Sequence, residues 1–368
     1  MTQGDSSPKT VIVLGAGASA ADGAPVQKDL FRDYFRLYQE ACPLPTGTRR
    51  DVQLADYFQF CWGINVDHDS LEHAAFPTFE EALGLLEIAD SRGEFFRGFG
   101  GLGPEASWGR ELRSHLISLI AVYLDKKLRA SGNYHGALVQ QLRTKGDIEQ
   151  TAFISLNYDI LIDNALLMQG ATGVNYGVRF DNQNNPRRSR AIWLLKLHGS
   201  PNWLFCPTCS ALDFYHGQKV AAAAVDDPSI SVCERCKGPR VPVMIPPTFF
   251  KVMSNFYLQQ IWKKAEAKLK EAERIVFCGY SFPDADIHFK YLLKRGEVNR
   301  PVPVPAAPEV FIANRPQDVP VAKYSSNDER TRYERFFRAK DRVHWTNLSF
   351  QEFAANPDLI TQESRWVR

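Results

Sequence analysis

The sequence predicts an α/β fold in which a doubly wound parallel sheet is interrupted by a helical module and by a cysteine-bearing ribbon. Short apolar runs typical of buried strands recur along the chain, and several end in glycine or in a small polar side chain. Four cysteines form two Cys-x-x-Cys pairs between two of these runs. With 368 residues, 44% of them hydrophobic, the chain is long enough to bury one large core or two modest ones.

The first strand is expected at Thr10–Leu14, where an apolar run leads directly into a glycine-rich turn. The turn spans residues 15–20, reads GAGASA and is followed by apolar residues at near-helical spacing, so it fits the pattern G-x-G-x-x-G/A. In Rossmann-like domains such glycines let the backbone approach the pyrophosphate of a dinucleotide. A simple tight turn has the same spacing, and both interpretations remain open.

Residues 51–150 predict helices without intervening strands. One apolar helical face is expected at residues 79–89 and a longer one at residues 112–128. Such faces usually pack into a core, although the longer one has enough apolar surface to contact another subunit as well. We therefore interpret this stretch as an inserted helical module.

The alternation of strands and helices resumes after residue 150. A long helix is expected at Asn255–Glu273, and strands are expected at Ala152–Ser155, Ile192–Leu197, Val241–Ile245, Arg274–Cys278, Val310–Ala313 and Val343–Trp345. A capping-box sequence at residues 349–352 marks a last helix. These elements assign residues 1–50, 151–200 and 241–368 to one discontinuous Rossmann-like domain, 51–150 to the helical insert and 201–240 to the ribbon.

The two cysteine pairs have the spacing of a metal site. Each pair places two thiolates on one tight turn, and two such turns close a tetrahedral Zn²⁺ site with the four ligands Cys206, Cys209, Cys233 and Cys236. Four thiolates leave no open coordination position, so we expect a structural zinc ribbon. A redox dithiol or an iron–sulfur site has the same residues and stays an alternative.

The overall composition excludes several classes of partner. A net charge of +2 gives no electrostatic footprint for direct nucleic-acid binding or for an anionic membrane surface. No apolar run approaches the roughly 20 residues that cross a bilayer. Metal-spaced cysteine pairs together with scattered single cysteines favour a reducing, cytoplasmic compartment.

Polar side chains follow three of the expected strands. Asn157 and Asp159 follow the first strand after residue 150, His198 follows the next, and Gly279 and Ser281 follow the strand that ends at residue 278. The carboxyl ends of strands in a doubly wound sheet border one crevice, so these residues can face the same ligand as the glycine turn. Taken singly, each is also a common cap or turn residue.

Together these motifs resemble the sirtuin superfamily. The similarity lies in the glycine turn, Asn-x-Asp after a strand, His-Gly before a paired Cys-x-x-Cys ribbon, Gly-x-Ser after a strand, and a late strand that ends in Asn314. The resemblance implies NAD as the bound dinucleotide. It implies that Asn157 and His198 are catalytic and that Asp159 binds the nicotinamide carboxamide. The residues implied to hold the phosphates are Gly15, Ala16, Gly17 and Ser19. Those implied to line the adenosine side are Gly279, Ser281 and Asn314.

The chain departs from sirtuin deacylases at the acyl-peptide groove. Residues 246–250 read PPTFF where deacylases carry Phe-Gly-Glu, and two prolines cannot donate strand hydrogen bonds. The segments at residues 279–284 and 79–83 look like the bacterial defence-associated sirtuin-like branch. That resemblance implies an NAD⁺ hydrolase releasing nicotinamide and ADP-ribose as an anti-phage effector. An NAD-dependent protein deacylase and a non-catalytic NAD or ADP-ribose sensor are the alternatives.

The same resemblance implies how such a hydrolase is restrained. We expect a homo-oligomer with low basal activity, because unrestrained hydrolysis would drain NAD⁺ from the cell. Members of this branch usually work beside a HerA-type ATPase or a nucleic-acid sensor. The sequence shows no such domain, so a separate partner chain is expected.

Overall fold

The structure is a computed structural model that describes residues 8–24, 29–41, 49–66, 71–94, 96, 105–128, 133–168, 173–183, 191–217, 228–244, 255–284, 286–300, 307–315 and 327–367. The chain divides into two compact units. The first contains Met1–Ala24, Ala130–Met244 and Met253–Arg368, and the second contains Pro25–Arg129 and Ile245–Val252.

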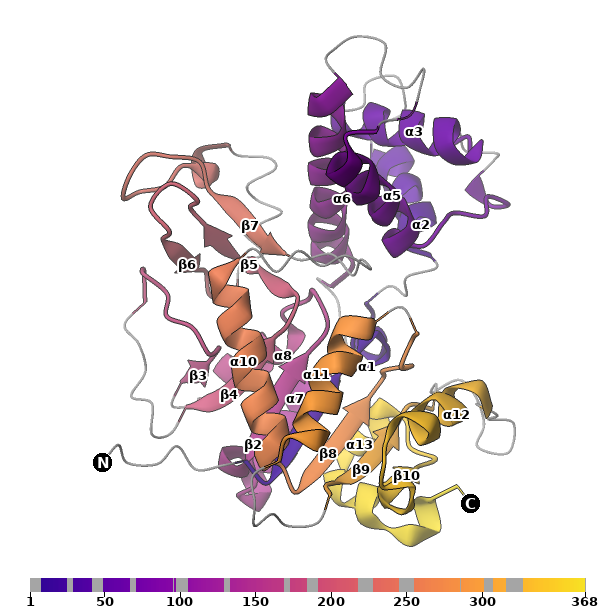
Figure 1. Cartoon of the computed structure of the whole chain (residues 1–368), viewed down its shortest axis with the longest axis vertical. Helices are drawn as coiled ribbons and strands as arrows, with labels where there is room; N and C mark the ends of the chain where they lie inside the picture. Colours follow the sequence, from indigo (N-terminus) through magenta and orange to yellow (C-terminus); the bar gives the residue numbers. More distant parts are fainter. Residues whose placement is uncertain are drawn as a thin grey trace. The chain divides into compact units, whose positions relative to one another are not determined.

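A seven-stranded parallel sheet forms the centre of the first unit (Figure 1). Its order is β10-β9-β8-β1-β2-β4-β3, and every pairing is parallel. The strands are β1 (Thr10–Leu14), β2 (Thr151–Ser155), β3 (Val174–Asn175), β4 (Ile192–Lys196), β8 (Arg274–Cys278), β9 (Glu309–Ala313) and β10 (Val343–Trp345). The chain winds first to one side of β1 and later to the other. This confirms the doubly wound sheet and places a topological switch point at the carboxyl end of β1.

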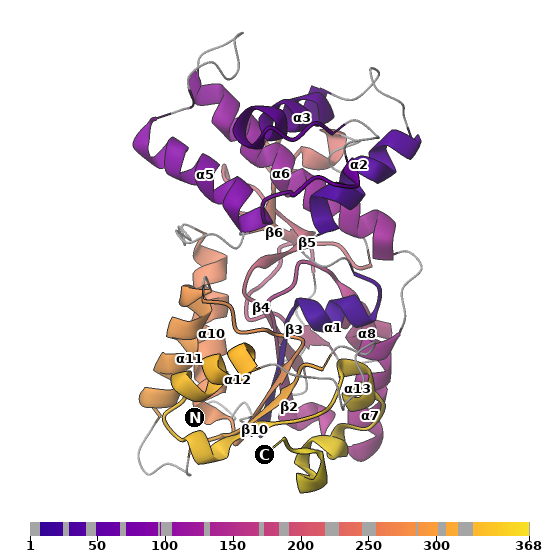
Figure 2. The ribbon, with the colours of Figure 1, turned by 90° about the vertical axis from the view of Figure 1, so that its right-hand side faces the viewer.

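Helices cover both faces of this sheet, as Figure 2 shows. On one face lie α10 (Phe256–Glu271) and α11 (Ile287–Val298). On the other face lie α1 (Ala16–Ala21), α7 (Tyr134–Lys145), α8 (Leu161–Met168) and α13 (Phe350–Ala355). A further helix, α12 (Asn327–Phe336), precedes β10. Because both faces are covered, the central strands can be mostly apolar, as the sequences of β1 and β2 are.

A buried carboxylate joins the end of α1 to the start of α7. Asp22 accepts hydrogen bonds from the backbone N–H of Tyr134 at 2.8 Å and of His135 at 3.1 Å, and its carboxylate also bonds Nδ1 of His135. Burial opposes ionisation of Asp22, but these partners hold its pKa below the ordinary value. Asp22 therefore satisfies N–H groups at the first turn of α7 that have no partner within the helix.

The ribbon has its own antiparallel sheet, in the order β6-β5-β7. Its strands are β5 (Gly199–Phe205), β6 (Leu212–Phe214) and β7 (Val241–Met244). The sequence analysis assigns the expected strand at 241–245 to the Rossmann-like domain, whereas in the structure β7 pairs with β5 in the ribbon's sheet. The ribbon therefore starts before residue 201 and ends after residue 240.

The second unit is helical. Its helices include α2 (Leu30–Ala41), α3 (Arg49–Trp62), α5 (Phe79–Arg92) and α6 (Glu105–Lys127). The apolar face expected on α6, which includes Leu112, Leu116 and Leu119, is buried, and α6 packs against α5, α3 and α2. This face belongs to the core of its own unit, so the expectation that it also contacts another subunit is not supported.

The division between the units differs from the expected boundaries at residues 50 and 150. It falls after Ala24 and after Arg129, because α2 packs on α6 whereas α7 packs on α8 and α13. Among the helices that the structure describes, none is long and apolar enough to cross a membrane.

Candidate functional site

Two glycine turns meet backbone to backbone at the switch point. The N–H of Gly15 donates to the carbonyl of Cys278 at 2.9 Å, and the N–H of Gly17 donates to the carbonyl of Gly279 at 2.8 Å. Gly279 has φ +62°, and a Cβ there would lie 2.0 Å from the nitrogen of Ala18. The glycines are thus required by this close contact, whatever ligand the turn binds.

A polar network joins the glycine turn to the loop after β2. The side-chain amide nitrogen of Asn157 donates to the carbonyl of Gly15 at 2.8 Å and to the hydroxyl of Ser19 at 2.6 Å. Ser19 in turn donates to Oδ2 of Asp159 at 2.5 Å. Asn157, Ser19 and Asp159 are all buried. The structure therefore brings together three of the residues that the sequence singles out.

This network fixes the orientation of the Asn157 amide. A carbonyl oxygen only accepts hydrogen bonds, so the side-chain nitrogen must face Gly15. The amide oxygen is then the atom of Asn157 that can accept a hydrogen bond from water. In this network the Ser19 hydroxyl bonds Asn157 and Asp159, and the expected contact of Ser19 with a phosphate stays a prediction. Ala16 is exposed at the start of α1.

His198 lies in the turn between β4 and β5, with its ring buried. Its Nδ1 is 2.9 Å from the carbonyl oxygen of Leu156, the residue before Asn157. Nδ1 must carry the hydrogen in this contact, so the neutral ring has its lone pair on Nε2. Tyr158 stacks near the ring with a centroid distance of 5.7 Å. His198 is therefore held beside Asn157 in the tautomer that a general base requires.

The turn after β8 is held by Asn314 as well as by β9, whose Ala313 carbonyl accepts from the N–H of Gly279 at 3.2 Å. The Asn314 amide accepts from the N–H of Tyr280 at 2.9 Å and donates to its carbonyl at 2.5 Å. It also donates to Glu329, whose pKa burial raises to about 7 against the opposing effect of that bond. Ser281 is exposed, and its carbonyl accepts from Arg332 at 2.9 Å. Asn314 therefore stabilises the turn after β8. The resemblance assigns the same region to the adenosine side of the ligand.

Sequence reasoning missed several residues of this region. Lys196, Asp163 and Glu329 are buried or half-buried ionisable residues. Lys196 contacts Asp159 and Glu329 contacts Asn314, whereas Asp163 is linked to the predicted residues through Lys196. Two of them carried a readable signal, because a lysine within the apolar run of β4 and an aspartate in the apolar helix α8 are both unexpected in a core. Glu329 carried no such signal in the sequence, because its hydrogen-bond partner is distant along the chain.

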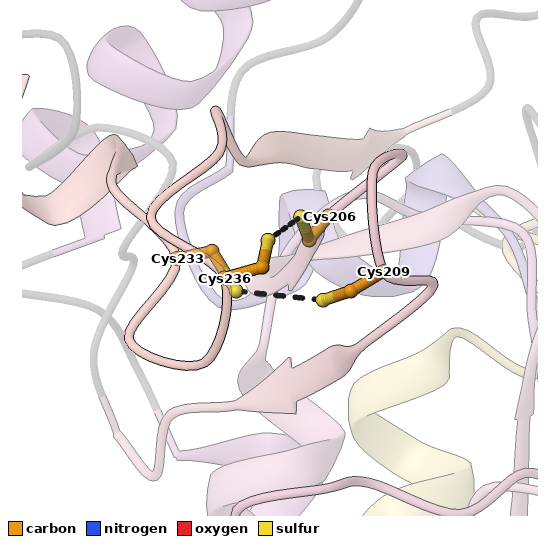
Figure 3. A group of neighbouring side chains, drawn as sticks. All are labelled: Cys206, Cys209, Cys233 and Cys236. Carbon is orange, nitrogen blue, oxygen red and sulfur yellow. Dashed lines mark hydrogen bonds between the residues drawn. The ribbon is translucent and has the colours of Figure 1, made fainter.

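The four cysteines converge as the spacing predicts (Figure 3). Their sulfur atoms lie within 4.8 Å of one another. Cys206 and Cys236 are 3.4 Å apart and Cys209 and Cys233 are 3.7 Å apart, sulfur to sulfur. Four thiolates at the usual Zn–S length of about 2.3 Å are separated by about 3.8 Å in a tetrahedron. The cluster therefore fits a structural zinc ion.

Both cysteine loops have the same local shape. Ser210 and Lys237, each the residue after the second cysteine of its pair, have φ +57° and +62°. The turn that follows lets the N–H of Gly238 donate to the sulfur of Cys236 at 3.4 Å. Burial raises the pKa of Cys206, but backbone N–H groups of Cys209 and Thr208 lower it to about 6. These donors favour the thiolate, which is the form that binds zinc.

A pocket of about 390 Å³ lies elsewhere, at the β3 edge of the parallel sheet. Its lining is aromatic and basic and includes Tyr176, Phe180, Trp193, Phe214, Arg179 and Lys264. Among the described residues that line it, none belongs to the predicted site. The pocket and the strand-end residues are therefore separate features of the first unit.

Comparisons with known proteins agree with the motifs. A model of the SIR2-like domain family matches residues 151–333, just under half of the chain. This span includes Asn157, His198, the cysteine ribbon and Gly279. No curated protein matches the chain significantly.

Solved sirtuin structures are similar to the chain at low identity. One is Sir2 with an inhibitor, 2′-O-acetyl-ADP-ribose and a deacetylated p53 peptide, at 15% identity over 95% of this chain and 92% of that chain, with a TM-score of 0.38. Another is Sir2 bound to an acetylated peptide, at 14% identity over 95% and 92% of the two chains, with a TM-score of 0.39. These values are too low to transfer a ligand or an activity. What the comparisons show is therefore a similarity of residues 151–333 to the SIR2-like domain family.

Proposed function

We propose that the protein is an NAD⁺ hydrolase that cleaves the bond between nicotinamide and ribose. The observation that carries the proposal is that Asn157 bonds the glycine turn at the switch point, while His198 bonds the carbonyl of Leu156, the residue before Asn157. An amide oxygen that can accept from water and an imidazole with its lone pair on Nε2 suit hydrolysis at an electron-poor carbon. The family match adds NAD as the expected dinucleotide.

In the proposed reaction the bond between ribose C1′ and the pyridinium nitrogen breaks, and its electron pair stays on nicotinamide. Positive charge develops on the ribose, and a water oxygen adds to C1′. Asn157 orients this water through its amide oxygen, and Nε2 of His198 takes the proton from water or from a ribose hydroxyl. The products are nicotinamide, ADP-ribose and one proton.

The sequence favours water over an acyl-lysine peptide as the acceptor of the ADP-ribosyl group. The two prolines at residues 246 and 247 remove backbone donors from the segment that pairs with peptide in deacylases. These residues lie outside the described part of the chain, so the inference rests on their identity alone. We extend the proposal to a cytoplasmic role in anti-phage defence, with a homo-oligomer and a separate partner chain, on the resemblance given above.

Incubation of the purified chain with NAD⁺ tests the proposal. Nicotinamide release without peptide, lowered about 10²-fold in His198→Ala, is the expected result. Release only when an acetylated peptide is present would identify a deacylase instead. Binding of NAD⁺ without release, also in the presence of candidate partner chains, would identify a sensor. A variant such as Lys294→Ala, whose contacts lie on α11 and α12, controls for nonspecific effects of substitution.

A further inference from the structure

A lysine with a fully buried side chain lies beside the loop that carries Asn157 and Asp159. Lys196 is the last residue of β4 and stands two positions before His198. Its ammonium group donates to Oδ2 of Asp163 at 2.9 Å and to the carbonyl oxygen of Asp159. The side chains of Lys196 and Asp163 are both 0% exposed.

Stability alone does not account for this ion pair. Moving an ammonium and a carboxylate out of water costs several kcal/mol for each ion, and apolar residues of similar volume often stabilise as well or better. Asp163 is further held by the Tyr176 hydroxyl at 2.9 Å. What an apolar pair cannot do is donate a hydrogen bond to the carbonyl of Asp159.

That hydrogen bond completes the fixation of Asp159. Its carboxylate already accepts from the backbone N–H of Leu161 at 2.9 Å and from the hydroxyl of Ser19 at 2.5 Å, and Ser19 accepts from Asn157. Lys196 adds a bond from the end of β4, the strand that leads into His198. The loop of Asn157 and the turn of His198 are thereby tied to one buried group.

We propose that Lys196 is a positioning residue, which fixes the loop of Asn157 and Asp159 relative to His198. The expected effect on turnover rests on the proposed hydrolase function, whereas the expected effect on the loop does not. Loss of the Lys196 bond should leave the fold intact but loosen residues 157–161. A loosened loop lowers the fraction of time in which Asn157 and His198 are aligned.

A pair of variants separates positioning from charge burial. Lys196→Met alone leaves the Asp163 carboxylate buried without its cation and is expected to destabilise the first unit. Lys196→Met combined with Asp163→Asn removes both charges and keeps an amide beside Tyr176. The reference is the unmodified protein, because Asp163→Asn alone would leave the Lys196 ammonium buried without its anion. The double variant differs from this reference in the ion pair and in the bond to the Asp159 carbonyl, and the control below accounts for the loss of a buried ion pair.

Two measurements are made on the full chain. Amide hydrogen exchange should be at least about tenfold faster in residues 157–161 of the double variant than in the reference. With NAD⁺ as the probe, kcat should fall about tenfold or more while KM changes less than about threefold, because the lost alignment acts on the chemical step. The paired charge removal Arg240→Met with Asp213→Asn, at a buried ion pair of 2.9 Å in the ribbon, is the control and should change neither quantity.

The outcomes distinguish the two proposals. Faster exchange in residues 157–161 without any NAD⁺ cleavage by the unmodified protein, alone or with candidate partner chains, would keep Lys196 as the loop's anchor and reject the hydrolase. Unchanged exchange, or exchange that rises equally across the first unit, would overturn the positioning role. A fall in kcat equal to that of the Arg240 control would overturn it as well.

Discussion

The ribbon and the strand-end network both keep polar groups out of water, but they do so by opposite means. In the ribbon, four sulfur atoms from two short loops face a common centre, where one zinc ion would satisfy them all. At the strand ends, Asn157, Ser19 and Asp159 satisfy one another, across up to about 140 positions of sequence. The ribbon therefore depends on something added to the chain, whereas the network depends only on the chain itself.

The difference determines how each region fails. Removal of the ion leaves four thiolates facing one another without compensation, so the ribbon should lose its structure as a whole. Removal of one side chain from the network leaves particular partners unpaired while the sheet remains. Substitutions in the two regions should therefore differ in whether they change stability or activity.

Metal removal should have the largest effect. We expect one zinc ion per chain, because the sulfur positions fit a closed tetrahedral site. Cys206→Ser should lose the metal and unfold the ribbon, since binding energies of structural zinc reach about 10 kcal/mol or more. Elemental analysis and thermal unfolding measure both. Zinc retained after Cys206→Ser and Cys233→Ser together would contradict the assignment.

Substitutions in the network should instead act on activity. His198→Ala and Asn157→Ala are each expected to lower NAD⁺ cleavage by about 10²-fold, the scale of a lost acid–base or positioning group. Asn157→Ala should also cost about 1–3 kcal/mol of stability, because it leaves the Gly15 carbonyl and the Ser19 hydroxyl without this partner. Turnover and denaturant unfolding on the same samples test this. Full activity in either variant would remove that residue from the proposed mechanism.

Asp22→Asn should destabilise the first unit by about 1–3 kcal/mol near neutral pH, as one oxygen is replaced by a donor that faces donors. The folded-state pKa of Asp22 is depressed below 3.8. Its contribution is therefore present above pH about 4 and is lost as the pH falls through the folded value. Unfolding at several pH values should give a constant difference from pH 5 to 8.

Glu329→Gln should have the smallest effect and the opposite sign. Burial raises the Glu329 pKa from 4.5 to about 7, so the folded state binds a proton more readily than the unfolded state between these values. Stability due to this group is full below pH 4.5 and falls as the pH rises through 7. The variant should gain about 1 kcal/mol at pH 8, after allowance for partial exposure, and nothing near pH 4.5. A gain that is independent of pH would show that charge is not the cause.

The same contrast explains what the sequence could predict. The ribbon ligands follow from spacing within two short segments, and β1 follows from one apolar run, so both were predicted with correct residues. The capping box formed by Ser349 and Glu352 is also confirmed. The pairing of β7 with β5 was not predicted, because an apolar run carries no information about which sheet it joins.

For a related reason, the sequence could not predict which side chains hydrogen-bond each other. The motifs place Ser19 and Asp159 at strand ends, but nothing in either segment specifies that the two side chains bond each other. The phosphate role expected for Ser19 rests on the sirtuin resemblance, which says nothing about the hydroxyl's bonds within the chain. The site residues themselves remain predictions until a ligand is measured.

The position of β1 has a consequence for synthesis of the chain. β1 pairs with β2 from Thr151 and with β8 from Arg274, so both neighbours are made long after it. At about 5–20 residues per second, the ribosome takes about 10 s or more to reach the first neighbour and longer to reach the second. During that interval β1, an apolar strand of five residues, has no partner strand at either edge. We expect nascent chains shorter than about 280 residues to need protection by a chaperone.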